Sequence, residues 1–162
     1  MKNFENEGST LWNINSENEM IQDSIFRRGQ NALLHIRSSE SPNNIVTNLE
    51  DRLPFDNQKQ HSLHGYIKTE NAKNVSIEAR LSMGRTSESL ITVSIGDSVS
   101  GSFNWKKYWN DIPYTEEAEF FDIRSNSDIP DSGLAYSWFD DVGFIEWDTL
   151  KLITEYPISI NY

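Results

Sequence analysis

The sequence has few residues in settings that could catalyse a reaction. It contains no cysteine, and its three histidines are His35, His61 and His64. Without cysteine there is no thiol nucleophile, no disulfide and no thiolate zinc site. His61 and His64 are three residues apart, which places them on opposite faces of a strand, so we do not expect them to share a metal ion. There is also no Gly-x-Ser-x-Gly nucleophile motif and no glycine-rich phosphate loop. These absences favour a protein that is not an enzyme.

One pair of carboxylates stands in an apolar setting. Asp140 and Asp141 interrupt the apolar stretch 138–145. Adjacent strand residues point to opposite faces, so we do not expect the two to act as the acid and base of a glycosidase. Asp140 shares its predicted face with Val142 and Phe144, and a buried carboxylate must be paired or bind a metal. A site of carboxylate and carbonyl oxygens, without Cys or His, would select calcium.

The elements that position these residues are predicted to be β-strands. Apolar and polar residues alternate with a period of two, polar turn sequences separate the runs, and no segment carries an apolar stripe of helical period. The pattern predicts an all-β fold, an antiparallel β-sandwich (jelly roll) of two sheets. The predicted strands are 32–37, 63–69, 75–83, 90–95, 104–109, 119–125 and 136–146, with a further one at 150–154, while 13–28 and 38–60 are predicted to be loops.

Length and charge limit the partners. A chain of 162 residues fits one domain, predicted here over 1–147, with 148–162 forming an extra edge strand or a linker. The net charge of −11 argues against nucleic acid and anionic membrane as partners. No apolar run reaches the roughly 20 residues of a membrane span. A polar composition with 12% aromatic residues is typical of an extracellular β protein, so we expect a secreted or cell-surface location, although the sequence carries no signal peptide.

Several short motifs occur in the order seen in a known family. They are Asn3-Phe4-Glu5-x-x-Gly8 with Trp12, Gly29-Gln30-Asn31-Ala32-Leu33, Gly65-Tyr66-Ile67-Lys68-Thr69-Glu70, Asn104-Trp105 before Ile112-Pro113, Phe121-Asp122-Ile123-Arg124, and Gly133 to Val142. Together they resemble jelly-roll carbohydrate-binding modules of the family 4, 9 and 22 type, which have a galactose-binding-like β-sandwich. The resemblance covers about residues 3–147. It is weakest in 13–28 and 38–60, which fit the family only by position, and in Tyr114-Thr115-Glu116-Glu117.

The resemblance implies a structural calcium ion that joins the start of the chain to the closing strand. Carried over to this sequence, Glu5 and Asp140 would supply side chains, and Asn3, Arg28 and Asn31 would supply carbonyl oxygens. The alternative is that Glu5 and Asp140 form ion pairs with Arg27 or Arg28.

The resemblance also implies a sugar groove on the outward face of one concave sheet. In such a groove aromatic rings stack on the C–H faces of sugars, and planar charged groups bond the hydroxyls. Trp12, Trp105, Tyr136 and Trp138 are assigned instead to the core or its rim, and the alternative for Arg80 is a cross-strand ion pair. The candidate sugar-binding residues are Tyr66, Lys68, Glu78, Arg80, Lys106, Tyr108, Trp109 and Arg124. The alternation that selects Arg124 also selects Asp122 on the same strand face.

The resulting hypothesis is a non-catalytic carbohydrate-binding module. The expected partners are a polysaccharide or oligosaccharide and a covalently linked polysaccharide-degrading enzyme of bacterial origin, and the module is expected to be a monomer. Two alternatives remain. One is an adhesive or structural sandwich domain of a cell-surface protein without sugar affinity, and the other is a small jelly-roll glycoside hydrolase or polysaccharide lyase.

Overall fold

A computed structural model describes residues 12–14, 17–41 and 45–147 of the chain. Within these ranges the secondary structure is entirely β, which confirms the predicted fold class, and no helix long and apolar enough to cross a membrane is found there. The strands are β1 (Trp12–Asn13), β2 (Glu19–Gln22), β3 (Ala32–Ser38), β4 (Ile45–Leu49), β5 (Leu53–Pro54), β6 (Gln60–Ser82), β7 (Ser89–Ile112), β8 (Phe120–Asp128) and β9 (Leu134–Trp147).

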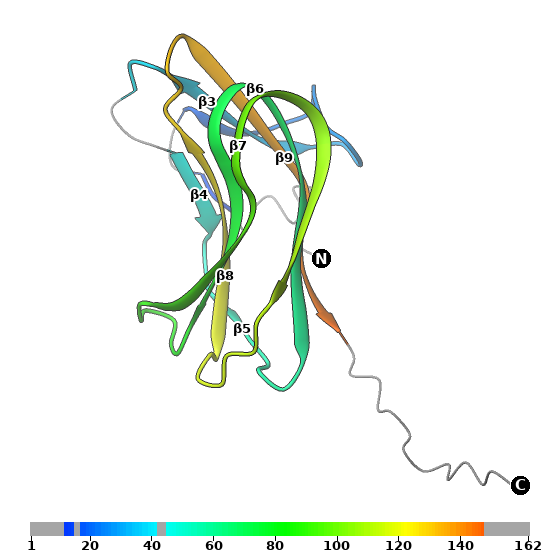
Figure 1. Cartoon of the computed structure of the whole chain (residues 1–162), viewed down its shortest axis with the longest axis vertical. Helices are drawn as coiled ribbons and strands as arrows, with labels where there is room; N and C mark the ends of the chain where they lie inside the picture. The colour runs from blue at the N-terminus through cyan, green and yellow to red at the C-terminus, as the bar shows by residue number, and fades with distance from the viewer. Residues whose placement is uncertain (1–11, 15–16, 42–44, 148–162) are drawn as a thin grey trace, which may run out of the picture.

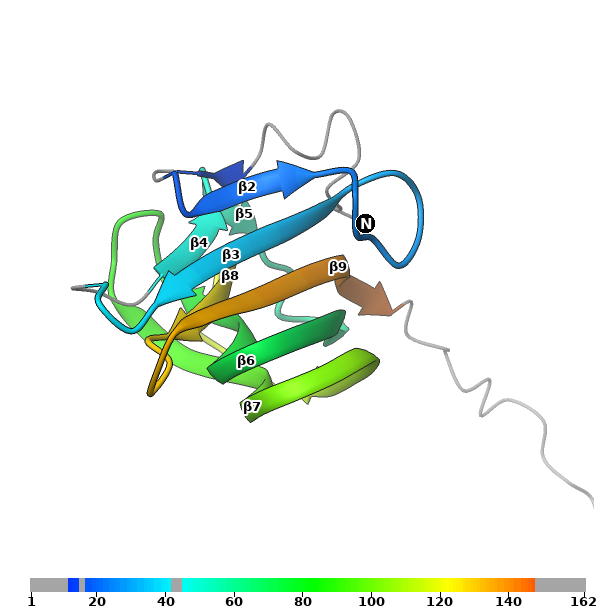
Figure 2. The same cartoon turned by 90° about the horizontal axis from the view of Figure 1, so that it is seen from above.

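Two long strands, β6 and β7, take part in both layers of the sandwich (Figures 1 and 2). The first half of β6 pairs with β9 and the second half of β7, whereas the second half of β6 pairs with β8 and the first half of β7. We call β2, β3, β9 and their β6–β7 partners the first sheet. The second sheet is β1, β4, β5, β8 and the other halves of β6 and β7. All pairings are antiparallel.

The bend between the two sheets occurs where the β6–β7 register shifts repeatedly, between Ile67 and Ile77. Asn71 and Asn74 adopt positive φ angles there, of 51° and 46°, a conformation that asparagine tolerates better than most residues. The polar residues 70–74, between the predicted strands 63–69 and 75–83, were expected to form a turn. The segment instead bends a continuous strand, because β-bulges curve a strand without ending its pairing.

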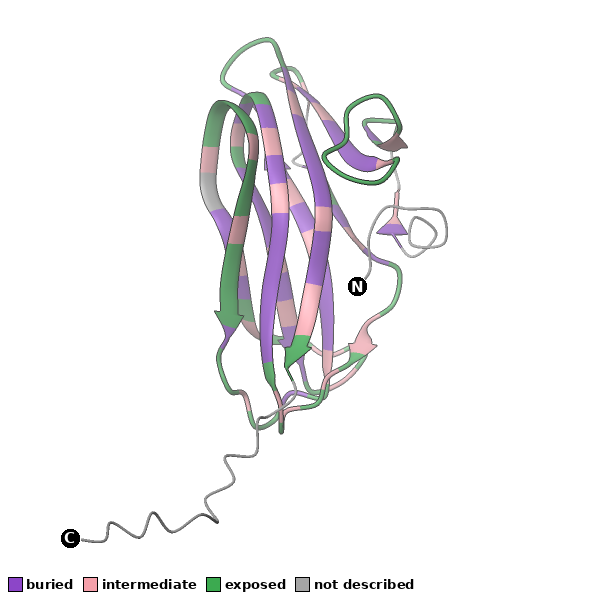
Figure 3. Ribbon diagram, turned by 90° about the vertical axis from the view of Figure 1, so that its right-hand side faces the viewer, coloured by how far each residue is buried: buried purple, intermediate pink, exposed green. Residues whose placement is uncertain are grey.

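The core lies between the sheets and follows the predicted alternation. Leu63 and Ile67 from the first half of β6 face Ile77, Ala79 and Leu81 from the second half, all 1% exposed or less. Trp12 is also in this core, as predicted. Figure 3 shows buried and half-buried positions along the central strands, and exposed positions along the outer part of β7.

Three strands lie in segments that were predicted to be loops. Residues 13–28 contain β2, and residues 38–60 contain β4 and β5. The prediction was wrong because these strands are only two to five residues long, too short to display a clear alternation. The predicted strand at 150–154 and the whole segment 148–162 lie outside the described residues.

A bulge in β9 overturns one assignment of faces. Tyr66 pairs with Asp140 and His64 with Gly143, so two residues of β9 lie opposite Gly65, and Asp141 has a φ of 48°. The extra residue reverses the alternation, so Asp140 points to the outer face while Val142 lies in the core. Trp138 is buried as predicted, but it pairs with Lys68 on the outer face and is not part of the core cluster.

A buried polar network ties the two sheets together. His35 of β3 is fully buried; its Nδ1 is 2.9 Å from Ser127 Oγ of β8, and its Nε2 is 2.8 Å from Thr47 Oγ1 of β4. The Thr47 hydroxyl donates to Glu19 of β2 at 2.6 Å. Because that proton is committed to Glu19, Nε2–H donates to Thr47. Burial lowers the pKa of His35 to about 3, so the imidazole is neutral at pH 7 and its Nδ1 accepts from Ser127.

This network makes the stability of the protein depend on pH. The unfolded chain protonates His35 near its ordinary pKa of 6.5 but the folded chain does not, so the free energy of unfolding falls as pH drops below 6.5, and the loss continues down to about pH 3. We expect His35→Gln, measured by urea unfolding between neutral pH and about pH 4.5, to lose up to about 1.4 kcal/mol less per pH unit than the wild type. Equal pH slopes in the two proteins would contradict the neutral buried imidazole.

Candidate functional site

The candidate sugar-binding residues occupy three separate places. Glu78, Arg80 and Arg124 lie on the outer face of the second sheet. Tyr66, Lys68 and Trp109 lie on the outer face of the first sheet, whereas Lys106 and Tyr108 lie on the edge strand β7. A single groove that contains all eight residues is therefore not formed.

The residues on the second sheet form a connected row of charges. Arg124 Nε donates to Glu78 Oε2 at 2.5 Å, and Arg80 donates to both carboxylate oxygens of Asp122, at 2.8 and 2.5 Å. Each pair joins directly opposite residues of β6 and β8. We call Glu78, Arg80, Asp122 and Arg124 the polar row. The cross-strand ion pair considered as the alternative for Arg80 is present, and hydrogen bonding to Asp122 raises the pKa of Arg80 above its ordinary value.

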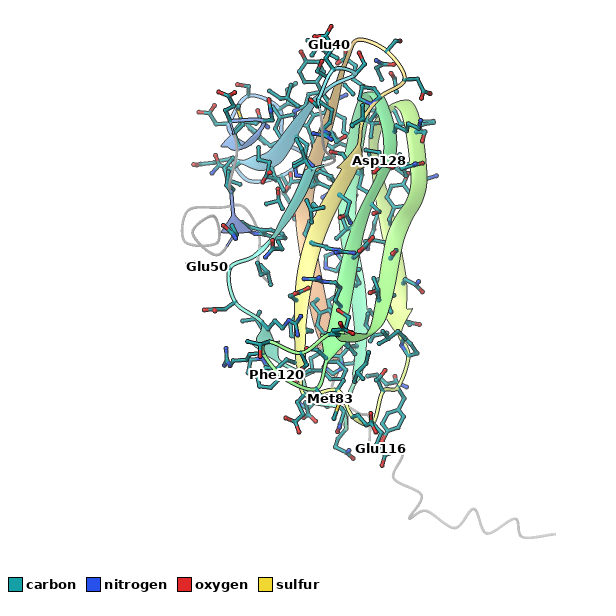
Figure 4. The ribbon with its side chains drawn as sticks, turned by 90° about the vertical axis from the view of Figure 1, so that its left-hand side faces the viewer. Glu40, Glu50, Met83, Glu116, Phe120 and Asp128 are labelled. Carbon is teal, nitrogen blue, oxygen red and sulfur yellow. The ribbon has the colours of Figure 1, made fainter. Side chains whose placement is uncertain are left out.

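A hollow of about 390 Å³ adjoins the polar row at Arg80 and Asp122. Loops before β5 and between β6 and β7 border it and contribute Arg52 and Arg85. Arg52 lies 3.5 Å from the Asp122 carboxylate and also donates to two loop carbonyls, so it is held in place. Figure 4 shows Glu50 on the loop beside this sheet, with Met83 and Phe120 at its lower end.

The polar row offers hydrogen bonds and not stacking. Arginine has five N–H donors, and the pair with Asp122 uses two of those on Arg80, so others stay available for a ligand. The aromatic side chain at the lower end, Phe120, is half-buried with the Arg85 guanidinium 5.1 Å from its ring centre. Hydroxyl groups are the ligand atoms that such alternating donors and acceptors suit.

Tyr66 and Lys68, the two candidates that β6 places on the first sheet, already contact other side chains of this protein. The Arg27 guanidinium carbon lies 3.4 Å from the centre of the Tyr66 ring, and Lys68 Nζ lies 5.6 Å from a ring centre of Trp138. Trp138 in turn stacks on Tyr136 at 5.8 Å. Because a cation covers one face of the Tyr66 ring, that face is not free to stack on a sugar.

The candidates on β7 differ in exposure. Tyr108 is half-buried, packs against the core, and burial raises the pKa of its hydroxyl. Lys106 Nζ lies 5.3 Å from the centre of that ring. Trp109, on the opposite side of the strand, leaves 46% of its surface exposed. It is the one residue of the eight that presents a largely exposed aromatic ring.

Asp140 is buried at the outer face and holds the loop after β2. Its Oδ2 accepts the backbone N–H groups of Arg27 and Arg28 at 2.7 and 3.0 Å, and its Oδ1 accepts that of Asp141 at 2.6 Å. Burial raises the pKa of Asp140, and these three bonds oppose the rise. The Arg27 guanidinium bonds the neighbouring Asp141 at 2.5 Å.

These contacts bear on the predicted calcium ion. Asp140 has the chemistry of a calcium ligand, and one lone pair of Oδ1 remains after its three N–H bonds. Among the residues that the structure describes, however, no group of three acidic or histidine side chains is placed to hold a metal. Asn3 and Glu5 lie outside the described residues. The structure therefore places one predicted carboxylate ligand, Asp140, and the calcium site stays a prediction.

Solved structures of other proteins resemble the fold of this chain over most of its length. The CBM22-2 xylan-binding domain of Paenibacillus barcinonensis Xyn10C superimposes with a TM-score of 0.60 at 13% identity, covering 90% of this chain and 98% of that one. The module TmCBM61, solved with β-1,4-galactotriose, gives 0.57 at 13% identity, covering 90% and 95%. This chain has the β-sandwich fold of carbohydrate-binding modules.

A third similar structure belongs to a larger protein. The enzymatically active domain of tailspike protein 4 of bacteriophage CBA120 gives a TM-score of 0.58 at 11% identity, covering 85% of this chain but 20% of that one. No protein-family model matches the sequence, and no curated protein matches it. The similarity is therefore one of fold. At these sequence identities, the roles of individual residues in the similar proteins cannot be assigned to residues of this chain.

Several residues of these surfaces were absent from the sequence-based site. Asp122 is not among them, because the alternation that selects Arg124 selects Asp122 on the same strand face. Arg52 and Arg85 lie in loops, where periodicity gives no signal. Trp147, which is 42% exposed, ends an apolar strand and is indistinguishable by pattern from a core residue.

The calcium prediction is tested by chelation. If Glu5 and Asp140 hold an ion, EDTA should lower the melting temperature of the wild type, because a ligand that binds the folded state stabilises it by mass action. The Asp140→Asn variant should show no such response, whereas Asp131→Asn, which changes an exposed acid elsewhere, should respond like the wild type. A wild-type melting temperature that is unchanged by EDTA would contradict the prediction.

Proposed function

We propose that this chain is a non-catalytic carbohydrate-binding module that binds a neutral polysaccharide along the polar row of its second sheet. The observation that carries the proposal is the row itself: four charged side chains lie next to one another on one sheet face beside a hollow of about 390 Å³. The fold, shared with carbohydrate-binding modules, supports the same function.

The ion pairs prepare the row for a ligand. Arg80 and Arg124 are held by Asp122 and Glu78 in the absence of a sugar. Binding therefore costs little additional side-chain conformational entropy. Their remaining N–H groups donate to sugar hydroxyls, and the remaining carboxylate lone pairs accept from them. Two cations and two anions balance, which favours an uncharged saccharide over a polyanion. The net charge of −11 acts in the same direction.

The similar structures agree with that ligand class. One is described as a xylan-binding domain, and another holds β-1,4-galactotriose, which is an uncharged saccharide. We propose that the module acts outside the cell, where it keeps a covalently linked polysaccharide-degrading enzyme close to its substrate and so raises the effective concentration of that substrate. The absence of a nucleophile motif from the sequence supports a role without catalysis.

A charge-neutral double variant tests the polar row. Glu78→Gln with Arg124→Gln removes one ion pair and keeps side chains of similar size, so the sheet should stay folded while the oriented donors are lost. We expect at least about tenfold weaker binding to a neutral polysaccharide, measured by affinity gel electrophoresis and calorimetry, for the loss of one charge-assisted contact.

The matched control is Lys73→Gln with Asp131→Asn. This pair is also joined at 2.5 Å, but it is exposed and lies away from the row. It should bind like the wild type. Equal binding by both double variants would refute the row as the binding surface. Failure of the wild type to bind any polysaccharide of a broad panel would favour the adhesive or structural alternative, and release of reducing ends or unsaturated products would favour an enzyme.

A further inference from the structure

A second cavity opens at the end of the first sheet. It has a volume of about 490 Å³, within the range of small-ligand sites, and is unconnected by any shared residue to the hollow beside the polar row. The ends of β7 and β9, the start of β6 and the loops before β6 and after β7 border it. We call it the end groove; the lining residues that matter here are Gln58, Gln60, Trp109, Asp111, Tyr114 and Trp147.

The end groove brings exposed aromatic rings together. Trp109 and Trp147 leave 46% and 42% of their surfaces exposed, and Tyr114 leaves 71%. The two indole rings have centroids 5.8 Å apart and planes inclined at 52°. Exposing large rings beside one another is unfavourable in water unless a ligand covers them, so such a cluster marks a binding site.

One of these rings is held in place by a chain of hydrogen bonds. The indole N–H of Trp147 donates to Ser62 Oγ at 2.8 Å, and the Ser62 hydroxyl donates to Asp111 Oδ1 at 2.7 Å. Ser62 is itself fully buried. The chain satisfies the indole N–H and orients the ring before a ligand binds. It also fixes Asp111 at the groove, with carboxylate lone pairs left to accept hydrogen bonds.

Rings that present a flat face, next to a carboxylate and amides, match the surface of a pyranose. Axial C–H bonds give such a sugar an apolar face that packs on an indole, while its equatorial hydroxyls lie at the rim where Asp111, Gln58 and Gln60 can bond them. Two cations lie at the groove. Lys59 is paired with Glu146, and Lys107 Nζ lies 5.8 Å from the centre of the Trp109 ring, on the same strand as the Asp111 carboxylate. The two cations are matched by two carboxylates, so no excess positive charge favours an anion, and the saccharide would stack on the ring face that Lys107 leaves open. A hydrophobic peptide would supply no hydrogen bond to the lone pairs of the Asp111 carboxylate that Ser62 leaves open.

We infer that the end groove is a second saccharide site, which stacks one pyranose of a neutral oligosaccharide on Trp109 and Trp147 and bonds its hydroxyls through Asp111. The inference rests on the proposed carbohydrate-binding function, but it does not depend on the polar row as the place of binding. It divides the chemistry between two surfaces, with stacking at the end groove and charged hydrogen bonding on the second sheet. A polysaccharide with many repeats could engage both surfaces, which would raise its avidity over that of either one.

The test uses the whole chain and three saccharides, cellotetraose, xylotetraose and β-1,4-galactotriose. The indole N–H resonances of Trp109 and Trp147 should shift on titration with at least one of them. Trp109→Ala should weaken binding of that saccharide about tenfold, as expected for loss of a stacking contact. Trp105→Ala is the matched control, because Trp105 is a tryptophan of the same strand that does not line the groove, and this variant should bind normally.

A second variant guards against loss of folding. Ser62→Ala keeps all the aromatic residues but removes the hydrogen bond that orients the Trp147 indole. Affinity should therefore fall several-fold, while the melting temperature changes little.

Absence of indole shifts with all three saccharides, or equal weakening by Trp109→Ala and Trp105→Ala, would overturn the inference. If Glu78→Gln/Arg124→Gln binds oligosaccharide normally and Trp109→Ala does not, the result supports the end groove as a saccharide site and contradicts the polar row. If Trp109→Ala binds normally and Glu78→Gln/Arg124→Gln does not, the result contradicts the end groove and supports the polar row.

Discussion

The continuity of β6 and β7 through both sheets is the constraint on which the rest of the molecule depends. A strand that pairs with β9 in one half and with β8 in the other fixes the relative positions of the two sheets through the backbone. Side chains of alternate positions in the two halves then meet as one core, which contains Leu63 and Ile77 alike. Because the same hairpin also carries Arg80 and Trp109, it fixes the polar row relative to the end groove.

Polar groups reinforce this arrangement at the places where the hairpin does not reach. The His35 network joins β2 and β3, the strands of the first sheet farthest from β7, to β4 and β8 of the second sheet. At the outer face, the Asp140 carboxylate gathers three backbone N–H groups and so holds the loop before β3 against β9. Both devices bury ionisable groups, and both satisfy them with hydrogen bonds, as burial requires.

The sequence predicted the two-sheet sandwich and the two halves of each long strand, because alternation over six to nine residues is a strong signal of half-buried strands. It did not predict that the halves join into continuous strands. It did not predict which candidate residues share a surface. The bulge at Asp141 reverses the alternation in β9, and the bend near Asn71 sends Tyr66 and Arg80 of one strand to different sheets. Neither the bulge nor the bend changes the composition of its strand. Alternation continued across either one therefore assigns the residues beyond it to the wrong surface. Trp147 was missed because exposure at a strand end depends on which loops cover it.

The position of β7 has a consequence for solubility. Among the described strands β7 pairs only with β6, so it is an edge strand of both sheets along much of its 24 residues. Such an edge is a template for pairing with another chain. Several features of β7 oppose that pairing. Gly96 and Gly101 have φ angles of 74° and 97°, the register shifts repeatedly between Ile77 and Ile67, and Lys106 and Lys107 stand exposed on opposite sides of the strand. The irregularities that let the hairpin serve two sheets therefore also make its free edge a poor partner for a second copy.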